Sequence, residues 1–460
     1  MNIWNSKSLA NVLKSEVLKN QVISTISINS KKIGENCLFI PIKGERFNGH
    51  DFIGEAFRNG ASLSLVEEKF ISRLELSSEL KKKLLIVDNT LYSMKILAKE
   101  ARERANKLKM IGITGSSGKT TLKNWTSEIL KQYFLTHKTI GNYNNQIGLT
   151  LSLSMMPKNT EIGVFELGMN QKDEINELTK IIKPNISIIT NVAPAHIENF
   201  NSEIEIAEEK SCIFSGHKKG IAIIPSESKY FEMLKIKAEK NFHKVYTFGI
   251  GKNSDFQFLG LKKEKSTIRF KILGENFTVK NLYLANHFYL NISIIIGIAK
   301  LLKINLNNLK KQLQNLSPVQ GRGSIHFVNY KKKKFTLIDD SYNSNPLSLE
   351  VSIKNLKTFY NYNRKICVIG DMLELGKQST KFHLDVIKIL YSEKIDIVYT
   401  IGKFSKVIFS NMQKKIICEH FNNLKSLENA IFSVIQTNDV ILFKGSNSIG
   451  LSKICKKLMD

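Results

Sequence analysis

Short apolar runs, each followed by a polar or glycine-containing turn, dominate the pattern of this chain. Between these runs, apolar residues recur with helical spacing, which predicts strands that alternate with helices. In the middle of the chain the runs are 110–113, 162–165, 186–189 and 221–224. This alternation predicts an α/β fold with a parallel sheet that is covered by helices on its faces.

The first part of the chain has shorter elements. Strand-like runs at 37–40 and 62–66 are joined by Gly and Asn turns, and a helical pattern at 91–107 follows them. At 460 residues the chain is long enough for about three domains with separate cores. We therefore predict three domains: N-terminal 1–88, central 89–316 and C-terminal 317–460.

Pro318 and the segment Gly321-Arg-Gly323 mark the start of the last domain, because these residue types favour a linker. The basic run 330–334 is interpreted as a solvated hairpin turn. Beyond the linker, four apolar runs are separated by helical patterns: 335–338, 366–369, 395–401 and 440–443. They predict a second doubly wound α/β domain.

The formal charge of +27 raises the question of nucleic-acid binding. Only 8 of the 68 basic residues are Arg, and the Lys residues are spread along the chain among Ile, Asn and Phe. Nucleic-acid readers depend on Arg and on clustered basic stripes. We therefore interpret the Lys content as codon drift in an AT-rich genome and expect no nucleic-acid partner, although the positive field would attract anionic nucleotides.

Cysteines and apolar segments indicate the compartment. The five cysteines are odd in number and include no Cys-x-x-Cys pair, which is typical of reduced thiols in a cytosol. The N-terminus lacks the charged-then-apolar pattern of a signal peptide, and no apolar run reaches the ~18 residues of a membrane span. We expect a cytoplasmic protein without membrane insertion.

The strongest motif is a glycine-rich turn that follows the run 110–113 and precedes a helical pattern with Leu122, Trp125 and Ile129 on one face. In that context, backbone N–H groups and the helix N-terminus bind phosphate. Ile113 stands where the standard Walker loop has Gly, so this is the shorter T-G-x-x-G-K-T-T form. The predicted ATP-binding residues are Thr114, Gly115, Ser116, Ser117, Gly118, Lys119, Thr120 and Thr121.

Within this loop we expect the N–H groups from Gly115 to Thr120 to converge on the phosphate oxygens. Lys119 would reach the terminal phosphates, and the Thr120 hydroxyl would bind Mg²⁺. Glu166 ends the run 162–165, and an acid that leaves a strand near a phosphate loop is usually a Mg²⁺ ligand. The alternative for Glu166 is a solvated strand end.

His196 lies just past the strand that ends at Thr190. A lone His is more often structural than functional, but its place after Glu166 favours a metal-binding or catalytic role. Lys210, judged from spacing alone, is an ordinary lysine on a helix surface.

Two polar segments are candidates for substrate contacts. Residues 141–148 form an Asn-rich loop, and its amides suit sugar, amide or phosphate recognition, although a left-handed turn would need the same residues. Residues 339–346 directly follow a strand, where ligands bind in open α/β sheets. The candidates are Asn142, Asn144, Asn145, Tyr342, Asn343 and Asn345.

Six segments together resemble the Mur ligases, most closely the branch that adds D-alanyl-D-alanine. They are Thr114-Gly-Ser-Ser-Gly-Lys-Thr120, 141–148, Phe165-Glu-Leu-Gly168, Ala195-His-x-Glu-x-Phe200, Asp340-x-Tyr-Asn-x-Asn-Pro346 and Gly370-Asp-Met-Leu-Glu-Leu-Gly376 with His383. The sibling branch that adds the third amino acid would show Asp-Asn-Pro-Arg in the last domain, and this chain has none.

The resemblance implies an N-terminal UDP-sugar domain, a central ATPase domain and a C-terminal Rossmann-like domain, acting as a monomer. It implies ATP-dependent ligation of D-alanyl-D-alanine to UDP-N-acetylmuramoyl-tripeptide through an acyl phosphate, with domain closure assembling the site. It also reverses the interpretation of Lys210, which occupies the position of a lysine carbamylated by CO₂ that helps to bind Mg²⁺.

The resemblance further implies roles for individual residues. The catalytic set would be Lys119, Glu166, His196 and Lys210, and the metal set Thr120, Glu166, His196 and Lys210. ATP would also contact Asn291, Arg322 and Asp340. The nucleotide sugar would contact Ser30, Phe39, Gly44 and His50 of the first domain.

Several positions depart from the family pattern. Asn29-Ser-Lys31 replaces Asp-Ser-Arg, Asn48 replaces Asp, Phe288 replaces Asn within Ala285-Asn-His-Phe-Tyr-Leu-Asn291, and Asn447 replaces Arg. None of them belongs to the phosphate or metal set. The alternatives are another Mur or folylpolyglutamate-type ligase and, from a different class, a basic P-loop ATPase that acts on nucleic acid.

Overall fold

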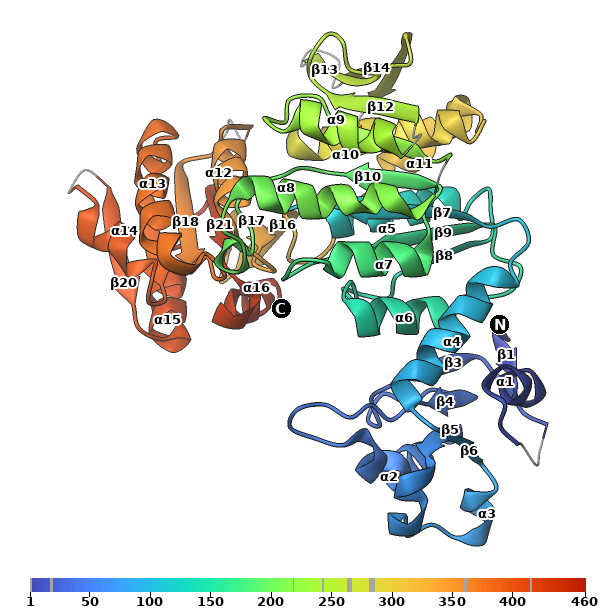
Figure 1. Cartoon of the computed structure of the whole chain (residues 1–460). Helices are drawn as coiled ribbons and strands as arrows, with labels where there is room; N and C mark the ends of the chain where they lie inside the picture. Colours follow the sequence, from blue (N-terminus) through green and yellow to red (C-terminus); the bar gives the residue numbers. More distant parts are fainter. Residues whose placement is uncertain are drawn as a thin grey trace.

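The computed structural model describes residues 2–16, 20–217, 219–241, 244–262, 267–280, 286–358, 362–413 and 416–460. Within them the chain forms three α/β regions, drawn from blue through green to red in Figure 1. This confirms the predicted fold class. None of the helices in the described ranges has the length and apolarity of a membrane span.

The N-terminal region contains a parallel sheet in the order β3-β4-β5-β6 and a small antiparallel pair, β1 and β2. The predicted strands at 37–40 and 62–66 are confirmed as β4 and β5. The elements are β1 (Trp4–Asn5), α1 (Ser6–Leu13), β2 (Val22–Ile23), β3 (Thr25–Ser27), β4 (Cys37–Phe39), η1 (Gly49–Phe52), α2 (Ile53–Arg58), β5 (Ala61–Glu67), η2 (Glu68–Arg73), α3 (Ser78–Lys81) and β6 (Leu84–Val87).

Helix α4 (Thr90–Glu103) connects the first region to the second, and its buried face of Met94, Leu97, Ala98 and Ala101 packs beside α1 and α6. The expected helix at 91–107 was too long by four residues at its end. At Arg104 the guanidinium donates to the carbonyls of Ile3 and Met156, which fixes the chain in a turn.

The central region is built on a nine-stranded sheet in the order β15-β14-β13-β12-β11-β10-β7-β9-β8. Its elements are β7 (Lys109–Thr114), α5 (Lys119–Leu130), β8 (Thr136–Lys138), α6 (Gln146–Ser154), β9 (Ile162–Glu166), α7 (Glu174–Ile182), β10 (Ile186–Ile189), η3 (Ile197–Asn199), α8 (Glu203–Ser211), η4 (Cys212–Gly216), β11 (Ile221–Pro225), α9 (Phe231–Lys240), β12 (Lys244–Gly249), β13 (Phe256–Lys262), β14 (Thr267–Ile272), β15 (Glu275–Lys280), α10 (Asn286–Leu301) and α11 (Leu306–Gln314).

The predicted parallel sheet is confirmed for the four apolar runs, which form β7, β9, β10 and β11. The antiparallel strands β13, β14 and β15 were not anticipated. Strands β14 and β15 alternate buried and exposed residues, because only one face of this ribbon is covered, so they contain no continuous apolar run.

The C-terminal region has a six-stranded sheet in the order β16-β17-β21-β18-β19-β20, and its four predicted strands are confirmed as β17, β18, β19 and β21. Its elements are β16 (Ser324–Tyr330), β17 (Lys333–Asp340), α12 (Pro346–Asn355), η6 (Leu356–Thr358), β18 (Arg364–Gly370), η7 (Gly376–Gln378), α13 (Ser379–Ser392), β19 (Ile397–Ile401), α14 (Lys406–Asn411), β20 (Ile417–Phe421), α15 (Leu424–Val434), β21 (Asp439–Lys444), η8 (Asn447–Ile449) and α16 (Leu451–Met459).

The basic run 330–334 is the hairpin that the sequence predicts. Lys331 and Lys332 join the antiparallel strands β16 and β17 as a two-residue turn, and both have a left-handed φ, 48° and 66°. These values are those of the type I′ turn, whose twist matches the flanking strands.

Strand register brings the functional loops together. Glu166 at the end of β9 lies level with Ile113 of β7, and Ile189 of β10 lies level with Thr114. The carboxyl ends of these three neighbouring strands therefore open on one edge of the sheet. The C-terminal region lies beside the central one in Figure 1.

Candidate active site between the central and C-terminal domains

The phosphate loop is held against the end of β10. Gly115 has a φ of 146°, and a Cβ there would lie 1.9 Å from the Thr190 hydroxyl oxygen, so no side chain fits. The N–H of Ser116 donates to the Asn191 carbonyl at 3.1 Å, and the N–H of Ser117 donates to the Asn191 side chain at 2.9 Å. The expectation that all N–H groups from Gly115 to Thr120 face a phosphate is therefore wrong for Ser116 and Ser117.

The first turn of α5 supplies the donors that a phosphate can use. Helix α5 begins at Lys119, and N–H groups of a first helical turn have no acceptor within their own helix. Lys119 folds back and donates to the Gly115 carbonyl at 2.7 Å. Burial lowers the pKa of Lys119, and the Glu166 carboxylate opposes that shift. A phosphate that enters this turn would give the ammonium an anionic partner.

Glu166 lies at the centre of a buried polar cluster. Its two carboxylate oxygens accept hydrogen bonds from the Thr120 hydroxyl at 2.8 Å and from the Asn144 amide at 2.9 Å. Burial raises the pKa of Glu166, but the ammonium groups of Lys119 and Lys123 outweigh it, so the pKa lies below its ordinary value. The carboxylate is thus held ionised beside the phosphate loop.

Lys123 is a member of this cluster that the sequence analysis missed. Its side chain is fully buried, its ammonium lies 3.6 Å from a Glu166 oxygen, and it donates to the Gly141 carbonyl of the Asn-rich loop. A signal was present, because Lys123 follows Lys119 by four residues and so shares its helix face. Thr190 and Asn191 were also missed, although they directly follow β10, a strand that is adjacent to the phosphate loop.

His196 and Lys210 approach the same space from the loop after β10 and from α8. His196 is partly exposed, and its Nδ1 lies 2.7 Å from a carboxylate oxygen of Glu374. Lys210 is buried, and its ammonium contacts the Met169 sulfur at 3.7 Å. Burial lowers the pKa of Lys210 well below its ordinary value, and the nearby Lys119 adds to the shift. The Glu209 carboxylate opposes the shift without cancelling it, and a buried amine is costly to keep charged.

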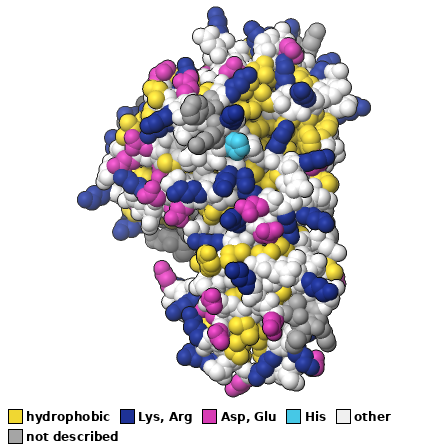
Figure 2. Space-filling view, turned by 45° about the vertical axis from the view of Figure 1, so that its right-hand side comes forward, with side chains coloured by type: hydrophobic (Ala, Val, Ile, Leu, Met, Phe, Trp, Pro, Cys, Tyr) yellow, Lys and Arg dark blue, Asp and Glu magenta, His cyan; other side chains and the backbone are white. Residues whose placement is uncertain are grey.

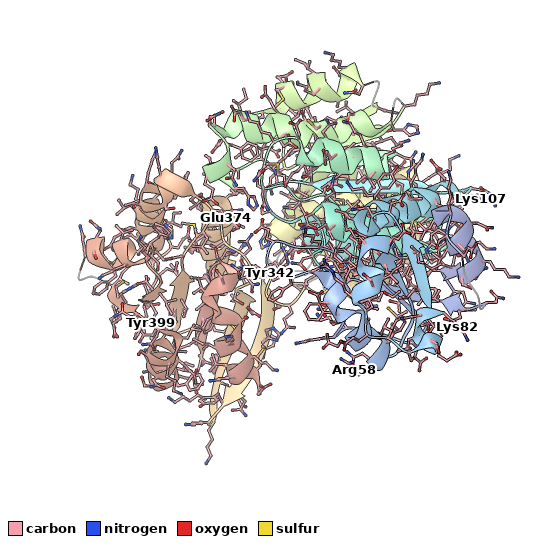
Figure 3. All side chains as sticks on the ribbon, turned by 60° about the horizontal axis from the view of Figure 1, so that its bottom comes forward. Arg58, Lys82, Lys107, Tyr342, Glu374 and Tyr399 are labelled. Atoms are coloured by element: carbon pink, nitrogen blue, oxygen red, sulfur yellow. The ribbon has the colours of Figure 1, made fainter. Side chains whose placement is uncertain are left out.

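The C-terminal domain forms the side of the site that faces the phosphate loop and the Asn-rich loop. The Asn142 amide donates to the Tyr342 hydroxyl at 2.5 Å, the Arg322 guanidinium lies 4.1 Å from the Tyr342 ring, and the Asn345 amide donates to the Ser116 carbonyl at 3.3 Å. Figure 3 shows Tyr342 on the side of the C-terminal domain that faces the rest of the chain.

Asp340 and Lys444 pair at the ends of β17 and β21, 2.9 Å apart, and Lys444 also donates to the Asn343 carbonyl at 2.7 Å. Lys444 is buried, so this pair fixes the backbone of the loop that carries Tyr342. The strand ends of the C-terminal sheet therefore present a preformed polar surface to the phosphate loop.

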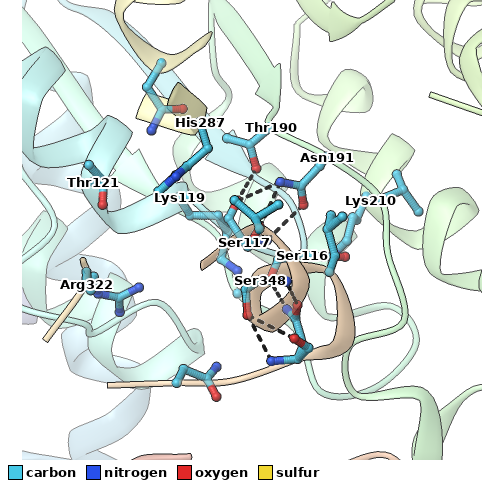
Figure 4. A pocket seen from close by; sticks show the side chains of 18 of the residues that line it. Ser116, Ser117, Lys119, Thr121, Thr190, Asn191, Lys210, His287, Arg322 and Ser348 are labelled. Atoms are coloured by element: carbon cyan, nitrogen blue, oxygen red, sulfur yellow. Dashed lines mark hydrogen bonds between the residues drawn. The ribbon is translucent and has the colours of Figure 1, made fainter. Parts of the chain in front are cut away.

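These groups enclose one cavity of about 790 Å³, shown from close by in Figure 4. Its wall contains most of the predicted site residues: Ser116, Ser117, Gly118, Lys119, Thr121, Asn142, Asn144, Asn145, Glu166, His196, Lys210, Asn291, Arg322, Asp340, Tyr342, Asn343 and Asn345. In the sequence they lie as much as 229 residues apart, as for Ser116 and Asn345. Thr114, Gly115 and Thr120 are buried behind this wall or support it.

The predicted nucleotide-sugar residues do not line this cavity. Phe39 and His50 are buried inside the N-terminal domain, and the His50 ring contacts the Phe70 ring in a tilted arrangement with the centroids 4.2 Å apart. Ser30 donates to Glu55 at 2.5 Å, and Gly44 lies in an exposed turn. Ser30 is itself buried at 8% exposure, so of these four residues Gly44 alone is exposed. Ala285 of the predicted adenine-side motif lies outside the described residues.

The cluster at Glu166 fits Mg²⁺. A carboxylate and a hydroxyl 2.8 Å apart are hard oxygen donors, and Mg²⁺ at nucleotides is held by one or two carboxylates, waters and phosphate oxygens. Across the described ranges no three His, Cys, Asp or Glu side chains gather into a complete metal cage. A bound nucleotide would therefore have to complete the ligand set, and an unmodified, protonated Lys210 could not contribute to it.

Comparisons with known proteins agree with this geometry. Family models match in chain order: the Mur ligase family catalytic domain at 22–105, the Mur ligase middle domain at 113–299 and the Mur ligase glutamate ligase domain at 325–447. A UDP-N-acetylmuramoyl-tripeptide–D-alanyl-D-alanine ligase of Rickettsia prowazekii is 33% identical over 98% of this chain and 99% of its own length.

Solved structures agree as well. MurF from Acinetobacter baumannii superposes with a TM-score of 0.83 at 26% identity, covering 99% of this chain and 98% of that chain. MurF from Thermotoga maritima in complex with ADP superposes with a TM-score of 0.77 at 29% identity, covering 95% and 97%. The similarity extends over all three regions of the fold and the loops that meet in the cavity, and the chain therefore belongs to the Mur ligase family, and within it to the MurF type.

Proposed function

We propose that this protein is an ATP-dependent ligase that joins D-alanyl-D-alanine to UDP-N-acetylmuramoyl-tripeptide in peptidoglycan precursor synthesis. One observation carries the proposal: the phosphate loop, the buried Glu166 cluster and the strand ends of the C-terminal domain share one cavity. The names of its full-length relatives supply the substrates.

ATP is the proposed phosphate donor. The N–H groups of the first turn of α5, together with Lys119, suit its terminal phosphates. Asn291 lies beside Gly118 on the other side of the loop, and its amide is 3.8 Å from the position of a Gly118 Cβ. The ADP bound to the Thermotoga maritima relative supports this assignment.

The reaction proceeds in two steps. An oxygen of the tripeptide's terminal carboxylate attacks the γ-phosphorus of ATP, and the bond from that phosphorus to the bridging oxygen of ADP breaks. The amine of D-alanyl-D-alanine then attacks the acyl carbon, loses a proton to solvent, and inorganic phosphate leaves. Lys119 offsets the repulsion between the carboxylate and the triphosphate, which grows in a water-poor cavity.

Thr120 and Glu166 are the residues that we propose to hold Mg²⁺, with His196 and a carbamylated Lys210 completing the set. Bound Mg²⁺ would supply further neutralisation of the phosphate charge. The burial of Lys210, which lowers the pKa of its amine well below the ordinary value, supports the modification: the neutral amine attacks CO₂, an N–C bond forms, and a proton leaves to solvent. Carbon-13 NMR with labelled bicarbonate should then show a carbamate carbon that Lys210→Ala lacks, and its absence from the unaltered protein would exclude the modification.

We further propose domain roles with the boundaries 1–88, 89–316 and 317–460. The first domain would bind the nucleotide sugar through Ser30 and the turn at Gly44, and the third would bind the dipeptide. Each main sheet falls within one of these ranges, which supports the division. The five free thiols support action in the cytoplasm, and a site formed by one chain supports a monomer.

The decisive experiment measures phosphate release by the purified protein with ATP and UDP-N-acetylmuramoyl-tripeptide. We expect turnover with D-alanyl-D-alanine and almost none with single amino acids, whether the tripeptide ends in lysine or in diaminopimelate. Preference for a single amino acid would favour another ligase of the family. Lys119→Ala should abolish turnover, and near-normal activity would refute the phosphate-loop assignment.

A nucleic-acid-dependent ATPase is the rival from another class. Figure 2 shows Lys and Arg side chains scattered over the face in view, with Asp and Glu among them, and not gathered into one stripe. This distribution does not resemble a nucleic-acid surface. ATP hydrolysis stimulated by DNA or RNA, with a steep dependence on salt, would overturn the proposal.

A further inference from the structure

A carboxylate from the C-terminal domain reaches the imidazole that the central domain contributes to the site. Glu374 lies in the segment 370–376, which the reaction described above does not use, and its Oε2 is 2.7 Å from Nδ1 of His196. Figure 3 shows Glu374 on the part of the C-terminal domain that faces the central domain. The contact joins two loops, one after β10 and one after β18, that are far apart in sequence.

The two loops are shaped for this contact. His196 and Glu374 both have a left-handed φ, 59° and 64°, which is uncommon for residues other than Gly and marks constrained positions. Gly376 is also left-handed, and a Cβ there would lie 3.0 Å from Glu198 Cβ, so the loops are packed closely. The backbone conformation of both loops therefore directs the two side chains toward each other.

The chemistry of the pair determines the state of the ring. An ionised carboxylate only accepts hydrogen bonds, so Nδ1 of His196 must carry the proton it donates to Glu374. The Nε2 lone pair is then the one available to the cavity. Carboxylates that accept from a ring N–H fix the tautomer and the orientation of functional histidines in this way.

The pair is poorly placed to stabilise the fold. The side chain of Glu374 is 49% exposed and that of His196 is 22% exposed. Exposed ion pairs contribute little to stability. A role in orientation explains the constrained backbone better than a role in stability.

We propose that Glu374 is a positioning residue that acts through His196: it holds the imidazole in the Nδ1–H tautomer, turned toward the cavity, only while the C-terminal domain is docked. The catalytic site is then incomplete without the C-terminal domain even though the phosphate loop, Glu166 and Lys210 belong to the central one. This inference deepens the proposed function and rests on it.

The first test observes the ring directly. Long-range proton–nitrogen NMR of histidine-labelled protein distinguishes the two tautomers, and comparison with His196→Ala assigns the signal. We expect the Nδ1–H form in the unaltered protein and a shift toward the Nε2–H form in Glu374→Ala. Glu374→Gln should keep the Nδ1–H form, because its amide oxygen still accepts. An unchanged His196 signal in Glu374→Ala would overturn the proposal.

The control variant is Glu350→Gln. Glu350 lies on α12 of the same domain, is also partly exposed and pairs with Lys354 at 2.5 Å. It should leave the His196 signal and the kinetic constants unchanged. A loss of activity in Glu350→Gln equal to that in Glu374→Ala would show a nonspecific charge effect and overturn the proposal.

The second test is a double-mutant cycle on turnover. Glu374→Ala should lower kcat by about 10- to 100-fold with little change in the KM for ATP, and the pair His196→Ala with Glu374→Ala should be no slower than His196→Ala alone. Losses that multiply would mean that Glu374 acts independently of His196. If the unaltered protein lacks ligase activity, the proposed function fails, whereas the NMR result still decides the contact.

Discussion

At the scale of single residues, the cluster behind the phosphate loop pairs two lysines, Lys119 and Lys123, with the Glu166 carboxylate. Lys123 shows this best, because it is fully buried and compensated by Glu166 at 3.6 Å and by the Gly141 carbonyl. Removing one partner of a buried ion pair leaves an uncompensated group. Breaking such a pair typically costs about 3–5 kcal/mol.

Lys123→Met should therefore lower the free energy of unfolding by about 3–5 kcal/mol, as measured by urea denaturation. Lys131→Met, at an exposed position where the same helix ends, is the control and should change it by less than about 0.5 kcal/mol. Equal losses of unfolding free energy in the two variants would show that the buried ion pair does not stabilise the fold.

His287 predicts a dependence on pH. Its Nδ1 accepts a hydrogen bond from the Asn355 amide at 2.8 Å, which requires the unprotonated nitrogen. Burial lowers the pKa of His287 to about 4, from an ordinary value of 6.5. Between these values the unfolded chain binds a proton that the folded chain does not bind, so stability falls as the pH falls through this window.

Each pKa unit corresponds to about 1.4 kcal/mol, so lowering the pH from 7 to 5 should remove roughly 2 kcal/mol of stability through this group. In His287→Gln, the free energies of unfolding measured with urea at pH 7 and at pH 5 should differ by that much less than in the unaltered protein. His326→Gln, on the edge strand β16, is the control. A pH dependence that His287→Gln leaves intact would mean that other groups cause it.

At the scale of elements, the phosphate loop depends on how closely it approaches β10. Gly115→Ala would place a methyl group 1.9 Å from the Thr190 hydroxyl, so the loop would have to move. We expect ATP affinity, measured by calorimetry, to fall more than about tenfold, since displacement of the loop misaligns the donors of α5.

Gly274→Ala is the matched control for this prediction. Gly274 lies between β14 and β15 with a φ of 86°, and no atom lies within 4 Å of the position of its Cβ. Only the strain of a left-handed alanine, about 1 kcal/mol, should then appear, as a lower unfolding temperature with unchanged ATP affinity. A similar loss of ATP affinity in both variants would show that the close approach of the loop to Thr190 is not its cause.

The elements also show how far the sequence could predict the fold. Buried parallel strands such as β7 and β9 are continuous apolar runs, and each is recognisable without its neighbours. Strands β14 and β15 are covered on one face, and their alternating pattern is weak. The end of α4 was also missed, because Arg104 is fixed by the carbonyls of Ile3 and Met156, contacts that only the folded chain creates.

The site shows the same difference between features that a local sequence pattern determines and features that depend on contacts in the folded chain. The positions of Lys119 and Glu166 at the cavity could be predicted because a local context, strand then loop or strand end, determines where they lie. Asn191 and Glu374 act through partners more than 70 residues away, Ser117 and His196. No local pattern carries that information, so sequence reasoning recovered the loop and the strand ends but not the residues that fix their geometry.

At the scale of the whole molecule, the two outer domains are attached differently. The N-terminal domain is joined through α4, whose apolar face packs beside α1 and α6 in a shared core. The C-terminal domain shares this apolar cluster through residues such as Leu375, but its contact with the central domain also contains hydrogen bonds of polar side chains: Asn142 with Tyr342, Ser116 with Asn345, His196 with Glu374 and His287 with Asn355. Polar interfaces of this kind open more readily than apolar ones.

Hydrogen exchange should reveal this difference. In the free protein, amides of α4 and α6 should exchange slowly, because opening them exposes the shared core, whereas 195–200 and 370–376 should exchange faster. Addition of a nonhydrolysable ATP analogue with UDP-N-acetylmuramoyl-tripeptide should slow exchange mainly in these two segments, since ligands that bridge the domains favour the docked state. Tyr342→Phe, which removes one bridging hydroxyl, should weaken that protection without altering α4. If ligands protect α4 as strongly as 370–376, the C-terminal domain is not the moving part, and the N-terminal junction must be the one that opens.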